Sequence, residues 1–300
     1  MRPRNVVGIL LFFCAYLITV VYIFSLATQA AANTAPTVDT ITIATSTPTG
    51  SNISEINLLE DTIRNIYVRG AFSDIDGCGD VKTSGTLKIV FYHSDASNAE
   101  ACNANNNDCY RGTYAGGECS ISGCTSGTEI SANYECTIPL QYYVLPSATN
   151  TTYWKAIVTS TDGGNLEGAT SVTVEVNPLI AITVSSVIDY GPIAIDTPST
   201  SEKTAVVRNT GNATIDTELS GTDMICEVNQ IPIEYQRYSL ISGTEYNQMT
   251  AMASSSVVLQ TNIFRQNSKD VYFRLSVPAS LIPLRGACAG TNTFIAVQDS

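Results

Sequence analysis

The positions of the cysteines constrain this chain more than any other feature of its sequence. There are nine, and only Cys14 lies in the apolar N-terminal stretch. The other eight, an even number, are Cys78, Cys102, Cys109, Cys119, Cys124, Cys136, Cys226 and Cys288. Disulfides persist in oxidising compartments. We therefore expect an exported protein, on the cell surface or extracellular, in which two groups of cysteines staple two separate domains.

The pairing within the first group of six cysteines is open, because spacing alone does not fix connectivity. Short separations favour two small local loops and a third bridge that ties the start of the group to its end. The pairs expected on this basis are Cys102–Cys109, Cys119–Cys124, Cys78–Cys136 and, in the second group, Cys226–Cys288. Zinc binding is the rival interpretation. It is disfavoured because the spacings lack a C-x-x-C knuckle and the chain has one histidine.

The N-terminus has the three parts of an export signal. Arg2 and Arg4 are basic, Val6 to Ala27 is almost entirely apolar, and small alanines follow at residues 30–32. This order is typical of a cleaved signal peptide. The apolar run also has about the ~20 residues that a membrane-crossing helix needs. We expect residues 1–32 to be a signal peptide or a membrane anchor, with everything after them outside the cytoplasm.

Composition excludes one class of partner. Only 14% of the residues are charged, the net charge is -12, and Lys and Arg total 15 without clustering. Nucleic-acid binding requires basic patches that neutralise phosphates, so we expect no nucleic-acid partner. The membrane, other surface proteins and glycans remain as partners.

Short runs rich in β-branched and aromatic residues, separated by turn signals, predict an all-β protein. We expect two Ig-like β-sandwich domains in tandem after the N-terminal segment. The expected boundaries are a Ser/Thr-rich spacer and first strand at 33–54, one sandwich at 55–177 with a Cys-rich insertion at 97–131, and a second at 178–300. The expected strands are Val38–Ile43, Thr62–Phe72, Thr86–His93, Tyr134–Leu140, Tyr153–Ser160, Ala169–Val176, Leu179–Ser185, Val187–Ile195, Thr204–Thr210, Ala213–Leu219, Ser255–Thr261, Asp270–Val277 and Thr293–Val297.

Two segments resemble known families. Phe72 to Val81 (FSDIDGCGDV), together with the Asp-Gly-Gly-Asn turn at 162–165, resembles prokaryotic Ig-like surface domains of the cadherin and PKD type. Val187 to Thr210, followed by the Asn-Thr-Gly-Asn turn at 209–212, resembles another Ig-like sandwich of archaeal and bacterial envelope proteins. The resemblance implies a cell-surface protein of a prokaryotic envelope, and the Cys-rich insertion departs from it.

One acidic turn is a candidate metal site. Asp74, Asp76 and Asp80 surround Gly77, which supplies the bend, and Asp162 follows a later strand at an adjoining end of the sandwich. Calcium prefers six to eight oxygen ligands, and carboxylates at this spacing provide several of them. No glutamate follows at the distance that an EF-hand loop needs. The alternative is a solvated turn whose Asp side chains bond to their own backbone. No other cofactor is expected.

The sequence offers no catalytic constellation. Its one histidine, His93, stands at the end of a predicted strand, and there is no G-x-S-x-G or H-E-x-x-H motif. Four aromatic residues are candidates for a sugar-stacking surface or for the core: Tyr142, Tyr143, Tyr153 and Trp154. Three N-glycosylation sequons begin at Asn52, Asn150 and Asn212.

These observations favour a non-enzymatic extracellular protein with an adhesive or structural role in a prokaryotic envelope. A filament or pilus subunit is the alternative, in which the strand-like tail Thr293–Val297 pairs with a neighbouring molecule. A secreted glycan-active hydrolase is a further alternative, since paired carboxylates can be remote in sequence.

Overall fold

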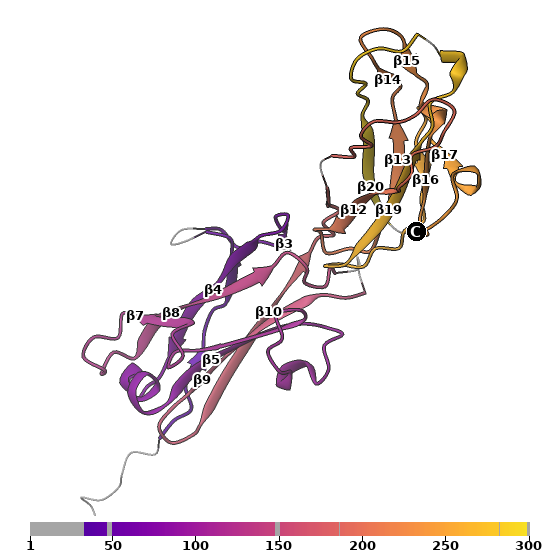
Figure 1. Cartoon of the computed structure of the whole chain (residues 1–300). Coiled ribbons are helices and arrows are strands. Elements are labelled where there is room, and N and C mark those ends of the chain that lie inside the picture. The colour runs from indigo at the N-terminus through magenta and orange to yellow at the C-terminus, as the bar shows by residue number, and fades with distance from the viewer. Residues whose placement is uncertain (1–32, 47–49, 148–150, 186, 282, 299–300) are drawn as a thin grey trace, which may run out of the picture.

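The computed structural model describes residues 33–46, 50–147, 151–185, 187–281 and 283–298 as two β-sandwiches that lie end to end (Figure 1). We call them the N-terminal and C-terminal sandwich. The expectation of an all-β protein is confirmed. The predicted signal or anchor at 1–32 lies outside the described residues. The described helices are turns of three to five residues, none long enough to cross a membrane. They are η1 (Asp80–Ser84), η2 (Ala99–Ala101), η3 (Ile233–Tyr235), η4 (Tyr246–Gln248) and η5 (Ala279–Leu281).

Two five-stranded sheets form the N-terminal sandwich. The first has the order β1-β4-β8-β7, with β2 also paired to β4, and the second has the order β3-β10-β9-β5-β6. The strands are β1 (Thr37–Val38), β2 (Thr42–Ala44), β3 (Glu55–Ile56), β4 (Ile63–Ser73), β5 (Thr86–His93), β6 (Cys109–Thr113), β7 (Cys119–Ser122), β8 (Ser131–Gln141), β9 (Trp154–Thr161) and β10 (Glu167–Val176). The segment predicted as a spacer and a first strand, Val38–Ile43, forms two short strands instead of one, and both β1 and β2 pair with β4.

Alternation along the long strands explains why these residues form facing sheets. In β8 and β9 every second side chain is buried, as the two-residue period of a strand predicts. Trp154 is fully buried between the sheets, and its indole stacks on Phe91 at 4.9 Å between ring centroids. The indole N–H donates to the carbonyl of Leu145 at 2.8 Å, so the polar atom of this large side chain is satisfied.

The Cys-rich insertion is ordered by edge strands and disulfides. It contributes β6 to one sheet and β7 to the other, and neither strand was predicted. The disulfides are Cys78–Cys124, Cys102–Cys109, Cys119–Cys136 and Cys226–Cys288. The predicted pairs Cys119–Cys124 and Cys78–Cys136 are therefore wrong. Cys119 and Cys136 are instead direct neighbours across the β7–β8 ladder, a long-range contact that sequence spacing does not reveal.

The C-terminal sandwich has fewer strands in its second sheet than the N-terminal sandwich. One sheet has five strands in the order β11-β12-β19-β16-β17, and the facing sheet has three in the order β18-β13-β20. A separate hairpin, β14-β15, is tied to the last part of the chain by Cys226–Cys288. The strands are β11 (Ile182–Val184), β12 (Lys203–Asn209), β13 (Ile215–Gly221), β14 (Met224–Ile225), β15 (Gln230–Ile231), β16 (Gln236–Ser239), β17 (Thr250–Ala251), β18 (Val257–Val258), β19 (Ser268–Leu275) and β20 (Asn292–Gln298).

Two predicted strands of this half differ from the structure. The segment Val187–Ile195 contains no strand in its described residues, although its apolar residues are strand-like. Gly191 takes a φ of 65° there, which interrupts an extended backbone. The predicted strand Ser255–Thr261 shrinks to the two residues of β18. The strands β14 to β17 were not predicted because they are short and carry no clear alternation.

A turn at the base of the C-terminal sandwich holds the two sandwiches together. Asn212 accepts a hydrogen bond from Leu179 N at 2.6 Å and donates to the carbonyl of Asn177 at 3.3 Å. From the same turn, the Thr210 hydroxyl donates to Glu60 of the N-terminal sandwich at 2.6 Å. The Asn-Thr-Gly-Asn turn singled out by its family resemblance therefore clamps the connecting segment.

Replacing Gly211 by alanine tests this clamp. A Cβ at position 211 would lie 2.0 Å from the carbonyl oxygen of Leu179, so the connecting segment must shift. Overpacking of this kind costs about 1–3 kcal/mol, and we expect a lower melting temperature of the C-terminal sandwich in calorimetry. Ser254→Ala, at an exposed residue of the same sandwich, is the control. Equal losses in the two variants would contradict the steric account.

Candidate functional site

The four predicted calcium ligands lie at one end of the N-terminal sandwich, on turns that touch. Asp74 follows β4, Asp80 begins η1 and Asp162 follows β9. The backbone N–H of Gly163 donates to Asp80 Oδ1 at 3.1 Å, which joins the later turn to the earlier one. A Cβ on Gly163 would lie 2.6 Å from that oxygen, so glycine allows the close approach.

Asp74 is the most unusual of the four. It is 1% exposed, and its Oδ1 accepts a hydrogen bond from Asp76 N at 2.9 Å. Its Oδ2 is buried and has no hydrogen-bond partner. Burial raises the pKa of the Asp74 carboxyl, and the neighbouring carboxylates of Asp76, Asp80 and Asp162 raise it further. A buried, half-satisfied carboxylate near three like charges favours a proton or a cation.

The first described residues of the chain cross this acidic cluster. Thr34 N donates to Asp76 Oδ2 at 2.7 Å, and the amide of Asn33 donates to Asp162 Oδ2 at 2.9 Å. Leu166 N donates to the other oxygen of Asp162 at 2.8 Å. The outer carboxylates are therefore held by neutral donors, whereas Asp74 Oδ2 is not.

The four carboxylates do not form a ready-made ligand cage. The described residues contain one group of three side chains whose potential ligand atoms all lie within 4.8 Å of one another, and it is Cys78, Cys124 and Glu129. The two sulfurs of that group are bonded to each other, so they are not free ligands. A cation shared by the aspartates would require their side chains to move together.

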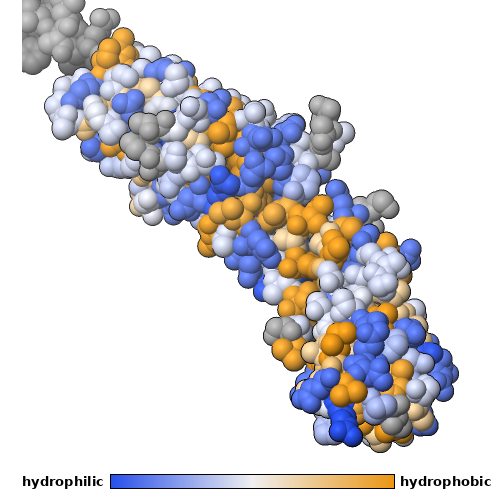
Figure 2. Space-filling model, turned by 90° about the horizontal axis from the view of Figure 1, so that it is seen from above, coloured by the Kyte–Doolittle hydropathy of each residue, from blue (hydrophilic) through white to orange (hydrophobic). Residues whose placement is uncertain are grey.

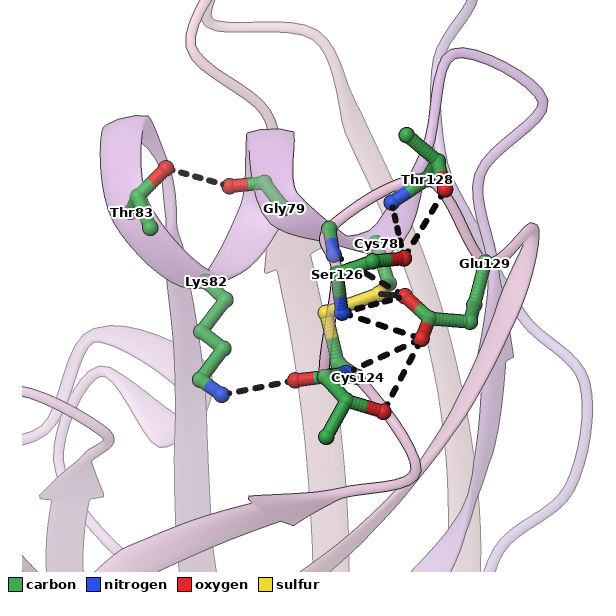
Figure 3. Close-up of a disulfide and its surroundings, with 10 residues drawn as sticks. Cys78, Gly79, Lys82, Thr83, Cys124, Ser126, Thr128 and Glu129 are labelled. Atoms are coloured by element: carbon green, nitrogen blue, oxygen red, sulfur yellow. Dashed lines mark hydrogen bonds between the residues drawn. A yellow bond between two sulfur atoms is a disulfide. The ribbon is translucent and has the colours of Figure 1, made fainter.

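The group around Cys78–Cys124 instead fastens a loop (Figure 3). The carboxylate of Glu129 accepts hydrogen bonds from the backbone N–H groups of Thr125, Ser126 and Gly127 at 2.9–3.2 Å. These backbone donors, with the hydroxyls of Thr125 and Ser126, hold the pKa of Glu129 well below its usual range. The disulfide and this loop together pin the Cys-rich insertion onto the turn that carries the acidic cluster.

The remaining candidates are dispersed. His93 is 2% exposed and stands edge-on to Trp154 at 5.7 Å between ring centroids, and burial lowers the pKa of its imidazole. Trp154 is fully buried, so it cannot stack on a sugar, while Tyr153 is 43% exposed. Of the two alternatives for Trp154, a sugar-stacking surface or the core, the structure therefore shows the core.

The sequons differ in access. Asn212 is 2% exposed and both atoms of its amide are hydrogen-bonded in the clamp, so it offers no acceptor for a glycan. Asn52 is exposed, with its carbonyl accepting from Ile43 N at 3.0 Å. Asn150 lies outside the described residues.

No family model matches the sequence, and no curated protein matches it. Among solved structures, the chain is similar to carbohydrate-binding modules of the β-sandwich superfamily with 13% identity and a TM-score of 0.23, over 89% of this chain and 94% of that chain. It is also similar to BcpA, the major pilin subunit of Bacillus cereus, with 12% identity and a TM-score of 0.24, over 80% of this chain and 67% of that one. Likenesses this weak support no inference about function. The cadherin and PKD resemblance remains a prediction.

The protonation of Asp74 should make stability depend on pH. The pKa of the Asp74 carboxyl is raised in the folded state. The protonated carboxyl therefore contributes fully to the free energy of unfolding below the usual carboxyl pKa of 3.8, and this contribution is lost as pH rises through the folded-state pKa. In the presence of a chelator, we expect Asp74→Asn to unfold at higher denaturant than the wild type at pH 7, with the difference shrinking toward pH 3.5. Denaturant titrations across this range measure it.

Asp39→Asn, at an exposed aspartate of the same sandwich, is the control and should not reproduce the pH-dependent gain. Parallel pH profiles for the wild type and Asp74→Asn would show that the carboxyl is solvated.

Proposed function

We propose that this chain is a non-enzymatic extracellular or cell-surface protein with a structural or adhesive role in a prokaryotic envelope, built from Ig-like sandwiches. One observation carries the proposal: all eight cysteines that follow the N-terminal stretch form disulfides. Such bonds persist outside the reducing cytosol. The apolar run Val6–Ala27 supplies the means of export, either as an anchor or as a cleaved signal.

The hydrolase alternative has less support. His93 is edge-on to Trp154, and its Nδ1 accepts a hydrogen bond from Asp95 N at 3.2 Å, contacts that suit a structural histidine. The four clustered carboxylates sit on turns, with neutral backbone and side-chain donors on three of them. This arrangement suits a structural site better than a pair of acid and base groups flanking a glycosidic bond.

In the filament alternative, the structure limits which edge of the C-terminal tail could pair with a neighbouring molecule. The tail predicted to add to a neighbouring molecule is β20, and one edge of β20 is already paired with β13 of its own sandwich. Strand exchange through this tail would break that ladder. Any association through β20 must use its outer edge instead.

The oxidation state of the cysteines in native cells tests the compartment. In intact cells, we expect no cysteine between Cys78 and Cys288 to react with a membrane-permeant maleimide until the protein is reduced and unfolded. Peptide mapping under non-reducing conditions should recover four linked pairs. Rapid labelling of the folded protein at these positions would contradict an oxidising location.

We further propose that the acidic cluster holds a divalent cation, with calcium as the probe, as part of this structural role. The support is Asp74 Oδ2, which is buried, lacks a hydrogen-bond partner and lies near three other carboxylates. Hard cations are bound by carboxylate and carbonyl oxygens, which this end of the sandwich offers in number.

Calorimetry of the full chain with millimolar calcium and with chelator measures the effect. At a hundredfold excess over the dissociation constant, binding stabilises the folded state by about 2.7 kcal/mol. The gain should vanish in Asp74→Asn and persist in Asp39→Asn. Superimposable melts of the wild type with calcium and with chelator would rule out the site.

A further inference from the structure

β20 differs in length and in chemistry from the other strands that end a sheet in the described structure. It ends the three-stranded sheet β18-β13-β20 and has seven residues, Asn292–Gln298, with the sequence NTFIAVQ. The other strands that end a sheet have two to five residues; they are β1, β2, β3, β6, β7, β11, β14, β15, β17 and β18. Proteins protect exposed edges with short strands, charges or proline, and β20 has none of these.

The hydrogen-bond pattern shows which backbone groups of β20 are unused. In β13, Ile215 N and the carbonyl of Thr217 bond away from β20, toward Ile263 and Leu259. Along an antiparallel strand, the backbone N–H and C=O groups of successive residues point to alternate sides. The backbone groups of Asp216, Glu218 and Ser220 therefore face β20. Their opposite residues are Val297, Ile295 and Thr293.

The N–H and C=O groups of Phe294 and Ala296 therefore point outward. The described structure contains no backbone hydrogen bond to either residue from outside its sheet. The unused groups have the spacing that a further antiparallel strand would match.

An apolar groove of about 1430 Å³ runs beside this free edge. The segment that follows β11 also lines this groove. Its described residues 187–193 belong to no strand. Its apolar lining includes Ile182, Ile188, Tyr190, Ile193 and Phe294, all of them half-buried. Figure 2 shows hydrophobic residues gathered in orange on the part of the molecule away from its N-terminal end.

Charge decides which strand can lie here. The chain carries a net charge of -12, so most of its surface repels a second copy. β20 itself has no charged residue, and two β20 strands can therefore meet without like charges opposite each other. The unused groups at Phe294 and Ala296 are also symmetric about Ile295, so the edge is complementary to itself.

We propose that the protein forms a two-fold symmetric dimer in which the outer edge of β20 pairs antiparallel with β20 of a second copy. Phe294 of each copy then lies opposite Ala296 of the other, with Ile295 on the symmetry axis. The two three-stranded sheets become one continuous sheet. The two apolar grooves meet at the interface, where each copy presents the same surface to the other. This inference does not depend on the proposed extracellular function.

Sedimentation equilibrium of the full chain in a density-matched mild detergent tests the dimer, with Ala296→Pro as the disrupting variant. Proline removes the outward N–H of residue 296 without removing a bond of the β13 ladder, and proline is tolerated on edge strands. The two-fold axis doubles the loss, because each copy contributes one proline. We expect the wild type to dimerise, and we expect Ala296→Pro to weaken dimerisation by about tenfold or more.

The matched control is Val258→Pro, on β18 at the opposite edge of the same sheet. Leu259 N bonds to β13, so the N–H of Val258 points away from it, and the residue is 50% exposed. This variant should dimerise like the wild type. Circular dichroism and non-reducing peptide mapping verify that both variants keep the fold and the four disulfides.

Three results would overturn the proposal. One is a wild-type chain that stays monomeric at about a hundred micromolar. Another is dimerisation that survives Ala296→Pro, which would assign the contact to another segment such as the apolar N-terminal run. The third is open-ended growth in mass with concentration, which indicates a head-to-tail contact rather than a closed two-fold pair.

Discussion

The structure depends on how completely two facing sheets bury the apolar side of each. In the N-terminal sandwich, two five-stranded sheets close around Trp154, and the largest core side chains there are fully buried. In the C-terminal sandwich, five strands face only three, and Phe294 at the open side is half-buried. Since apolar burial is the main favourable term in folding, the second sandwich retains surface that a partner can still cover.

Disulfides compensate where sheets do not hold the chain. The insertion at 97–131 lacks a long strand, and its two short strands lie at sheet edges. Cys78–Cys124 closes a separation of 46 residues, for which the chain-entropy model gives roughly 4 kcal/mol of stabilisation. The bridge and the Glu129 loop together place the insertion against the acidic cluster. The irregular insertion therefore forms part of the same end of the N-terminal sandwich as the proposed cation site.

Much of the fold could be predicted from the sequence, because a strand buried on one face has apolar and polar residues in alternation. The strand at Thr86–His93 coincides with β5, and β8 and β9 were placed within a few residues. The exchanged pairs among Cys78, Cys119, Cys124 and Cys136 could not be predicted, because the pairing follows the β7–β8 register and not the distance along the chain.

The site was predicted only in outline. The sequence placed Asp74, Asp76 and Asp80 on one turn, because three residues so close around a glycine must be neighbours. It did not reveal that Asp74 is buried with one oxygen unpaired, which depends on how Asn33, Thr34 and the 162–166 turn pack around it. The free edge of β20 could not be predicted either, because an edge strand and a central strand of this composition have the same sequence pattern.

Amide hydrogen exchange along β20 tests most directly the claim that the C-terminal sandwich is completed by a second copy. Thr293, Ile295 and Val297 bond to β13, so their amides should be protected at every protein concentration. The amides of Phe294 and Ala296 should exchange fast in dilute protein and become protected as concentration rises. Protection of both sets at all concentrations, or fast exchange at Phe294 and Ala296 throughout, would contradict the claim.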